Sequence, residues 1–371
     1  MQKNIFNTKN YWRNIDKQIL SCFLVLFILG VFISFSSTSF LADERLNKSY
    51  YFFFQKHLIY ACASFLVMIL ISTLSTNVIN KSLIPIFIFF FLLLLLVPFF
   101  GIEVKGAKRW LNLYIFRFQP IEFVKPFFIL IVAQVISTSK VKSLNFSHII
   151  SFFFLSFITL LLLIQPDVGQ TILLIASWSS LIFVSGFSII FLILIFLILI
   201  VLFFLLLYTA PERFSYVISR ITSFMDPEKS GWSQSQKAIE AIKQGGFKGQ
   251  GMGEGILKES VPEAHTDYII AVISEEFGSV ISILIIMIFL FIAFRIIKKV
   301  ISFTNNYYKL ALCGLTSLII FQTFIHIGVN ANLLPSTGMT LPFLSYGGSS
   351  LLSTGIVAGI ILNYTSLTEK N

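Results

Sequence analysis

Residues 191–208 read FLILIFLILIVLFFLLLY, without a polar side chain before the final tyrosine. An α-helix rises 1.5 Å per residue, so a helix of this length covers most of the hydrocarbon core of a bilayer, which is about 30 Å thick. A helix that is apolar on every face has no side to present to water. The run therefore predicts a membrane-spanning helix that faces lipid.

The rest of the chain has the same apolar character. Hydrophobic residues make up 56% of the 371 residues and charged residues only 12%, against about 25% charged in soluble domains. We therefore expect an all-α fold, a polytopic integral membrane helical bundle of about ten transmembrane helices. The candidate spans are 18–38, 56–76, 82–101, 122–138, 148–165, 167–186, 187–209, 268–294, 308–330 and 346–364.

The spans are distributed along the whole chain, which predicts one transmembrane domain over 18–364. Residues 1–17 are too polar for a signal peptide, and the apolar run after them lacks a small-residue cleavage site, so we expect the first span to be retained. A long polar loop, 210–267, separates the seventh and eighth spans, and 365–371 form a short tail.

The net charge of +10 comes from Lys and Arg scattered through the loops rather than from one amphipathic face. This pattern argues against nucleic acid and favours anionic lipid or a phosphate-bearing substrate. Cys22, Cys62 and Cys313 lie in apolar segments without metal-ligand spacing, so we expect neither a disulfide nor a metal site from them.

Counting Lys and Arg in the short loops favours a cytoplasmic location for both termini. The loops after the third, fifth, seventh and ninth spans then lie outside, and they hold most polar motifs of the chain. The absence of a convincing internal repeat weakens a transporter interpretation. The shorter outer motifs are GAKRW (106–110), FQPIE (118–122), QPDVGQT (165–171) and LPSTGMTLPFLSYGGSS (334–350).

The long loop ends in KESVPEAHTDYIIAVISEEFG, residues 258–278, where acidic residues continue into an apolar helix. A carboxylate in a membrane helix is costly unless it is paired or hydrated, and it commonly marks a functional site. The side chains singled out in this way are Glu263, Asp267, Glu275 and Glu276.

Ser260, with Glu263 three residues later, predicts a capping box and a helix that begins there. In such a helix Asp267 lies one turn after Glu263 on the same face. The two glutamates deeper in the span are interpreted as members of a structural ion pair, with Lys125 as a suggested partner, rather than as catalytic groups.

Two other segments of the long loop are interpreted as structural. SQSQKAIEAIKQ (233–244) has its apolar residues at helical spacing and predicts a short helix along the membrane surface. GGFKGQGMGEG (245–255) lacks the spacing of a nucleotide-binding loop and is interpreted as a flexible turn that lets backbone approach a neighbour.

Several intramembrane residues suggest helix packing. Gln322, His326 and Asn330 recur every four residues, so they share one face and are expected to form interhelical hydrogen bonds rather than to touch substrate. Gly355 and Gly359 form a GxxxG pattern, which indicates close packing of two helices.

Two outer motifs contain candidate binding residues. Lys108 and Arg109 beside Trp110 suit an anionic headgroup with an aromatic anchor at the interface. Asp167 follows Pro166 at the start of a span, where it either caps the helix or takes part in function.

The order and spacing of GAKRWLNL, FQPIEFVK, QPDVGQT, GQGMGEGILKESVPEAHTDYIIAVISEEFG and LLPSTGMTLPFLSYGGSS resemble the SEDS family of bacterial cell-wall proteins over nearly the whole chain. Within the family the chain is more similar to the cell-division branch than to the elongation branch. It departs from that branch in one turn, which reads Pro335-Ser336-Thr337-Gly338 where PTKG is usual.

The resemblance implies an inverting peptidoglycan glycosyltransferase that polymerises lipid II at the outer face of the bacterial cytoplasmic membrane, for the septal wall. It implies a class B penicillin-binding protein, a transpeptidase, and other division proteins as partners. The implied reaction requires no nucleotide or redox cofactor, and the one cofactor considered is a divalent cation, Mg or Mn. The alternatives are a lipid II flippase, a division scaffold or the elongation branch.

The resemblance also assigns site residues. Asp267 is expected to be the general base, and Glu263 to orient a cation or the acceptor. Lys108, Arg109 and Lys258 are expected to stabilise the pyrophosphate. The remaining candidates for contact with substrate are Trp110, Gln119, Asp167, His265, Thr266 and Ser345.

Overall fold

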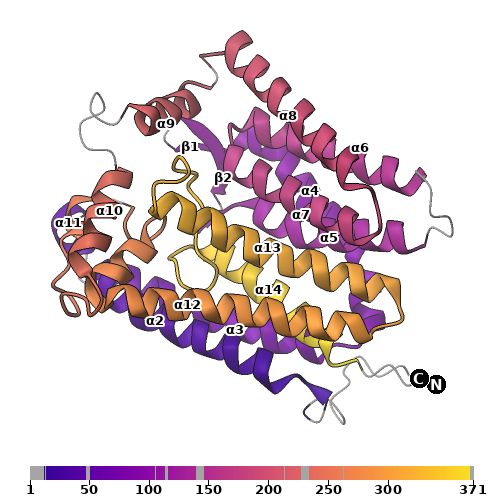
Figure 1. Cartoon of the computed structure of the whole chain (residues 1–371), viewed down its shortest axis with the longest axis horizontal. Coiled ribbons are helices and arrows are strands. Elements are labelled where there is room, and N and C mark those ends of the chain that lie inside the picture. The colour runs from indigo at the N-terminus through magenta and orange to yellow at the C-terminus, as the bar shows by residue number, and fades with distance from the viewer. Residues whose placement is uncertain are drawn as a thin grey trace. The chain divides into compact units, whose positions relative to one another are not determined.

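The computed structural model describes residues 12, 14–46, 51–104, 106–112, 116–138, 146–212, 214–226, 234–261 and 263–367, with the side chains of 38–46, 206 and 258 left out. Each of the ten predicted spans corresponds to one helix (Figure 1). These helices are α2 (Lys17–Leu46), α3 (Phe52–Thr73), α4 (Thr76–Phe100), α5 (Pro120–Ser137), α6 (Phe146–Ile164), α7 (Val168–Val184), α8 (Ile189–Thr209), α12 (Ile269–Ser302), α13 (Asn306–Asn330) and α14 (Gly348–Thr365).

Eight helices of the described part are long and apolar enough to cross a membrane, and α7 is a shorter apolar helix. The long loop adds three short helices, α9 (Ser215–Met225), α10 (Gln234–Gly245) and α11 (Leu257–Ser260). The predicted polytopic helical membrane fold is therefore confirmed.

A small sheet is the exception to the all-helical prediction. β1 (Ile102–Val104), β2 (Ala107–Asn112) and β3 (Arg117–Phe118) form an antiparallel sheet in the order β1-β2-β3. Glu103 lies opposite Lys108 across β1 and β2, an arrangement that favours opposite charges. The sheet holds the GAKRW motif in a defined strand rather than in a flexible loop.

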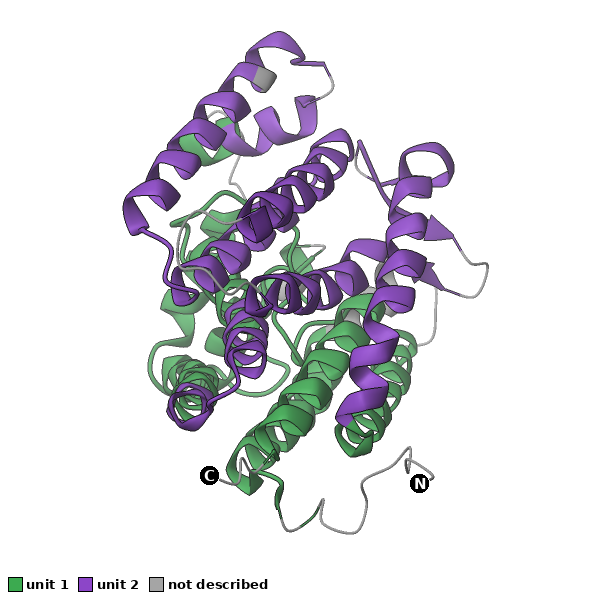
Figure 2. Ribbon diagram, turned by 90° about the vertical axis from the view of Figure 1, so that its right-hand side faces the viewer, with its two compact units in different colours: residues 1–75, 222–295, 319–368 green, residues 76–221, 296–318, 369–371 purple. Residues whose placement is uncertain are grey.

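The contacts divide the chain into two compact units (Figure 2). Unit 1 comprises Met1–Ser75, Thr222–Arg295 and Ile319–Thr368, and unit 2 comprises Thr76–Ile221, Ile296–Leu318 and Glu369–Asn371. The single domain over 18–364 stays a prediction.

In unit 1, α14 packs closely along α3. A Cβ atom on Gly355 would collide with Ser64, and one on Gly359 would lie 2.7 Å from the carbonyl oxygen of Met68. Both positions therefore require glycine, and the helix packing predicted from the GxxxG pattern is confirmed.

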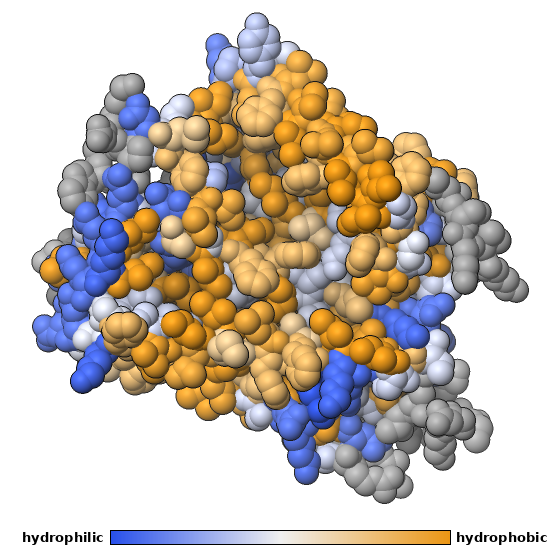
Figure 3. Space-filling view, viewed as in Figure 1, coloured by the Kyte–Doolittle hydropathy of each residue, from blue (hydrophilic) through white to orange (hydrophobic). Residues whose placement is uncertain are grey.

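In unit 2, α5 packs against α4, α6 and α7 and is buried along most of its length. Its burial confirms that this short, Lys-containing span lies inside a helical bundle. By contrast, α8 exposes apolar side chains on all sides, and Val201 is 66% exposed. Apolar side chains cover much of the visible helical surface, whereas hydrophilic ones gather over α10 and α11 (Figure 3).

Candidate functional site

The segment that leads into α12 is a turn rather than the predicted helix. α11 ends at Ser260, and the Oγ atom of Ser260 donates to the carbonyl oxygen of Leu257 at 3.3 Å. Residues 263–268 form turns, and α12 begins at Ile269. The predicted capping box and the start of the helix at Ser260 were therefore wrong, although the backbone N–H of Asp267 donates to the carbonyl oxygen of Glu263 at 3.0 Å, so the two residues are one turn apart as predicted. Asp267 nevertheless lies at the mouth of the helix and is only 6% exposed.

Three consecutive carbonyl groups of this turn are held by a distant part of unit 1. The backbone N–H of Tyr346 donates to His265 at 3.1 Å. The Ser345 hydroxyl donates to the carbonyl oxygen of Thr266 at 2.7 Å, and Asn330 Nδ2 donates to that of Asp267 at 2.9 Å. These bonds explain why the turn does not continue as a helix: its carbonyls already have partners, and the backbone that carries Asp267 is fixed.

The polar face of α13 supplies part of this support. Asn330 also accepts a hydrogen bond from the backbone N–H of Ala271, at 3.0 Å, in the first turn of α12. Gln322 Nε2 donates to the carbonyl oxygen of Thr340 at 2.8 Å, and His326 Nδ1 lies 2.9 Å from that of Met339. The predicted interhelical hydrogen bonding is therefore confirmed for Asn330, whereas Gln322 and His326 bond to the connection between α13 and α14.

His265 lies two residues before Asp267 and packs between Phe53 and Tyr346. The centroid of its ring lies 5.6 Å from the ring centroid of Phe53 and 5.6 Å from that of Tyr346. Its Nδ1 atom is buried and has no hydrogen-bond partner among the described residues. Burial lowers the pKa of His265 to about 4, although the Glu263 carboxylate acts in the opposite direction. The imidazole is therefore neutral near pH 7, and it can offer a hydrogen bond but no charge.

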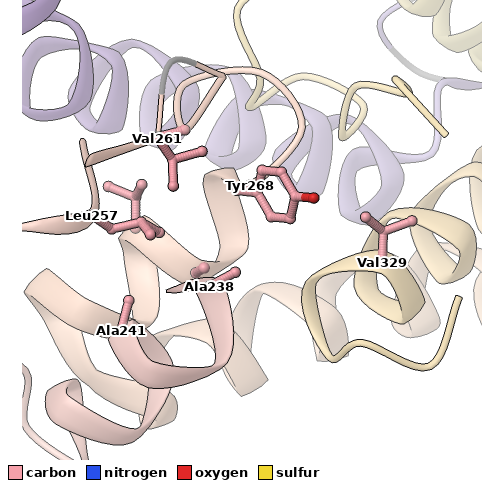
Figure 4. Packing of buried hydrophobic residues seen from close by; sticks show 9 residues of the cluster. Ala238, Ala241, Leu257, Val261, Tyr268 and Val329 are labelled. Carbon is pink, nitrogen blue, oxygen red and sulfur yellow. The ribbon is translucent and has the colours of Figure 1, made fainter. Parts of the chain in front are cut away.

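An apolar cluster lies beneath this turn (Figure 4). It joins Ala238 and Ala241 of α10 and Leu257 of α11 to Tyr268, which precedes α12, and to Val329 of α13. The predicted short helix is therefore confirmed, and Ala238 and Ala241 on its apolar face are buried against protein. Its location along the membrane surface stays a prediction. The cluster fixes the end of the long loop on the helices of unit 1.

A second group of candidate residues lies in unit 2. The Arg109 guanidinium donates to the carbonyl oxygen of Pro166 and lies 3.7 Å from a carboxylate oxygen of Asp167. Gln119 Nε2 donates to the same oxygen at 3.4 Å. Asp167 is also the N-cap of α7 and accepts from the backbone N–H of Gln170 at 3.5 Å. The capping role of Asp167 is therefore confirmed, and its part in function stays a prediction.

Two residues of α9 near this group, Tyr216 and Arg220, were not identified from the sequence. The guanidinium carbons of Arg109 and Arg220 lie 5.4 and 4.3 Å from the ring centroid of Tyr216 in α9. Lys108 is exposed and Trp110 is partly buried on β2. Tyr216 is 107 residues from Arg109 in sequence, so nothing local signals their contact.

A buried polar network lies deeper in unit 2. Lys125 Nζ is 3.0 Å from Glu122 Oε2 and donates to Gln170 Oε1 at 2.7 Å. Gln170 Nε2 donates to Glu122 Oε1 at 2.7 Å. Glu275 instead accepts backbone N–H groups, and Glu276 accepts from the Ser36 hydroxyl. The suggested pairing of Lys125 with these two glutamates was therefore wrong.

The remaining candidates are placed as follows. Glu263 and Thr266 are partly buried in the turn beside Asp267, and Lys258 belongs to α11. Within the described ranges, no cluster of three or more His, Cys, Asp or Glu side chains has the geometry of a metal site. The sequence candidates thus form one group around Asp267 in unit 1 and one around Asp167 in unit 2.

The fold and these polar groups define a multi-pass membrane protein with a buried aspartate at a helix mouth, carried on a hydrogen-bonded backbone turn. The sequence profile described as "Cell cycle protein" (FTSW_RODA_SPOVE) matches residues 16–370, and the chain belongs to this family.

Curated relatives support the assignment over almost the whole chain. The chain is 34% identical over 353 residues to "Probable peptidoglycan glycosyltransferase FtsW" of Caulobacter vibrioides, covering 95% of this chain and 89% of that one. It is 31% identical over 347 residues to "Stage V sporulation protein E" of Bacillus subtilis, covering 92% and 94%.

Solved structures show the same fold. A chain from "Structural coordination of polymerization and crosslinking by a peptidoglycan synthase complex" has a TM-score of 0.75 at 23% identity and covers 95% of this chain and 97% of that one. The rod shape determining protein RodA of Thermus thermophilus has a TM-score of 0.67 at 22% identity, with the same coverage.

Proposed function

We propose that this protein is a peptidoglycan glycosyltransferase that polymerises lipid II at the outer face of the cytoplasmic membrane during septal wall synthesis. The proposal mainly rests on Asp267, which is only 6% exposed at the mouth of α12 and whose backbone carbonyl oxygen accepts a hydrogen bond from Asn330. The names of the relatives support the reaction class, and FtsW relatives support the division branch over the elongation branch.

In the proposed reaction, a sugar hydroxyl of the acceptor attacks the anomeric carbon of the donor. A glycosidic C–O bond forms as the bond to the pyrophosphate oxygen breaks, and polyprenyl pyrophosphate leaves with the electron pair. Asp267 takes the proton of the attacking hydroxyl. A single displacement inverts the anomeric configuration. His265 and Thr266, adjacent in the turn, are proposed to contact the substrate, and Glu263 to orient the acceptor or a divalent cation.

Lys108 and Arg109 are proposed to bind a pyrophosphate headgroup, with Lys258 as a further cation and Trp110 and Gln119 as neighbours. Two cations that donate charge-assisted hydrogen bonds suit phosphate oxygens. Asp167 is proposed to hold Arg109 in position through the 3.7 Å contact between their side chains. The transpeptidase partner is proposed by analogy with the peptidoglycan synthase complex, one chain of which has the same fold as this protein.

The proposed activity is tested by adding purified lipid II to this protein in complex with its class B penicillin-binding protein and separating the products by size. We expect glycan strands without added nucleotide. If no polymer forms while lipid II crosses vesicle membranes that contain the protein, the flippase alternative replaces the proposal. If neither occurs and division proteins still assemble on it, a scaffold is the better description.

Substituting both cations of β2 is expected to weaken substrate use. Lys108→Gln with Arg109→Gln should raise the KM for lipid II by about 10-fold or more, because a hydrogen bond to a charged group contributes about 1.5–3 kcal/mol. Arg117→Gln, at an exposed cation of β3 in the same sheet, is the matched control and should leave KM unchanged. An unaltered KM in the double variant would remove both residues from the binding site.

Both termini are proposed to lie in the cytoplasm, because this orientation follows the distribution of Lys and Arg. In a variant without its three native cysteines, a cysteine at Ser336, between α13 and α14, should react with a membrane-impermeant thiol reagent added from outside. One at Lys299, near the end of α12, should react only after permeabilisation. The reverse pattern of labelling would invert the proposed topology.

A further inference from the structure

α12 is interrupted close to the candidate site. Gly278 has φ 86° and ψ 164°, which is not helical, so the helix divides into a short segment, Ile269–Phe277, and a long one. We refer to Ile269–Phe277 as the half-helix. Because the helical hydrogen-bond ladder stops at Gly278, the long segment alone does not determine the orientation of the half-helix. Asp267 lies two residues before the half-helix.

The glycine-rich loop Gly245–Gly255 takes the place of the missing helical turn. In an uninterrupted helix the N–H of Ser279 would donate to the carbonyl oxygen of Glu275; both groups instead bond to the loop. The bonds that cross the interruption are Gln250 N to Glu275 O at 2.8 Å, Gly251 N to Glu276 O at 3.0 Å, and Ser279 N to Gly246 O at 2.9 Å.

Glycine is needed on both sides of this contact. A Cβ atom on Gly278 would collide with the carbonyl oxygen of Phe247, and one on Gly249 would collide with that of Glu276. Both glycines also have a positive φ, which other residues rarely adopt. The interpretation of this loop as a turn that permits close backbone approach is confirmed, and the neighbour it approaches is the interruption of α12.

The Glu275 side chain ties the far end of the same loop to the half-helix. Its carboxylate is 1% exposed and accepts the backbone N–H of Ile256 at 2.8 Å and of Leu257 at 3.1 Å. A buried carboxylate is costly without such donors, and charge-assisted bonds are stronger than neutral ones. These bonds to the Glu275 carboxylate form when the loop and the half-helix are held together.

We propose that Glu275 is a positioning residue for the reaction, which fixes the half-helix, and with it Asp267, by holding the glycine loop in place of a helical turn. The proposal rests on the proposed function. Glu275 lies two turns along the half-helix from Asp267 and acts through the backbone, whereas Asn330 and Ser345 hold the other end of the same element.

The test uses variants of the full chain in complex with its transpeptidase. Glu275→Gln keeps the length of the side chain and one accepting oxygen, whereas Glu275→Asp keeps the charge and shortens the reach. Positioning predicts that Glu275→Asp lowers kcat by about 10-fold or more, since a displacement of about 1 Å can reduce a rate 100-fold. KM for lipid II should change by less than about 2-fold, and Glu275→Gln should retain more of kcat than Glu275→Asp. Amide hydrogen exchange at residues 250–257 should be faster than in the wild type in both variants, and faster in Glu275→Asp than in Glu275→Gln.

Glu276→Gln is the matched control, because Glu276 is equally buried but its carboxylate accepts from Ser36 of α2. It should retain kcat per folded molecule even if its Tm falls. Wild-type kcat in Glu275→Asp, or equal losses of kcat in the Glu275 and Glu276 variants, overturns the positioning role alone. Absence of polymer from the wild-type complex contradicts the proposed function instead.

Discussion

Asp267→Asn is expected to lower lipid II polymerisation by about 100-fold or more, since a general base typically contributes about 100- to 10,000-fold. The amide has nearly the shape of the carboxylate but cannot take a proton from the acceptor hydroxyl. The fold should survive, because an amide is cheaper to bury than an ion. The bonds to the backbone of the turn, from Tyr346, Ser345 and Asn330, do not involve the altered atoms.

Glu259→Gln provides the control for this variant, since it makes the same chemical change at an exposed position of the same loop. Its turnover should match that of the wild type. A structural role for Asp267 would reverse the order of damage: the variant would misfold or lose its partner first, and its activity per folded molecule would be nearly normal.

Lys125→Met is expected to reduce the free energy of unfolding by about 3–5 kcal/mol, as found when one partner of a buried ion pair is removed. The change leaves the Glu122 carboxylate, whose side chain is 5% exposed, without its cation. The measurement is the Tm of the purified protein in detergent. Lys81→Met, at an exposed position of α4, should leave Tm within the error of the assay.

A second substitution distinguishes the cause of that loss. Adding Glu122→Gln to Lys125→Met replaces the buried Glu122 carboxylate by a neutral amide, and much of the lost stability should return. If the double variant is as unstable as Lys125→Met, the loss comes from packing of the Lys125 side chain rather than from an uncompensated carboxylate.

The spanning helices were predictable because hydropathy alone identifies them. Lipid forces backbone polar groups to bond within each segment, so a long apolar run has few alternatives to a helix. For α5, the charge of Lys125 was also a signal of burial, because a charged side chain is costly to expose to lipid. The sheet at 102–118 was missed since its strands are short and one of them has only two residues.

The errors near Asp267 have a common physical cause. The capping box at Ser260 is a local signal, and tertiary hydrogen bonds to the carbonyls of His265, Thr266 and Asp267 prevailed over it. The interruption at Gly278 likewise depends on the glycine loop, which is distant in sequence. A glycine inside an apolar span was the one available signal.

The ion pair of Lys125 illustrates a signal that was present in the sequence. Glu122 precedes Lys125 by three residues, a spacing at which helical side chains meet. The more distant glutamates of α12 were suggested as partners instead. Tyr216 had no comparable signal, because its contact with Arg109 joins α9 to β2 across the fold of unit 2.

The most direct test of the central claim measures binding and turnover in one preparation. Monodisperse wild-type and Asp267→Asn complexes are compared for lipid II affinity and for polymer formed per mole. If Asp267 is the general base, affinity should be equal and turnover about 100-fold or more lower in the variant. Turnover near that of the wild type, at equal affinity, would contradict the assignment of Asp267 as the general base.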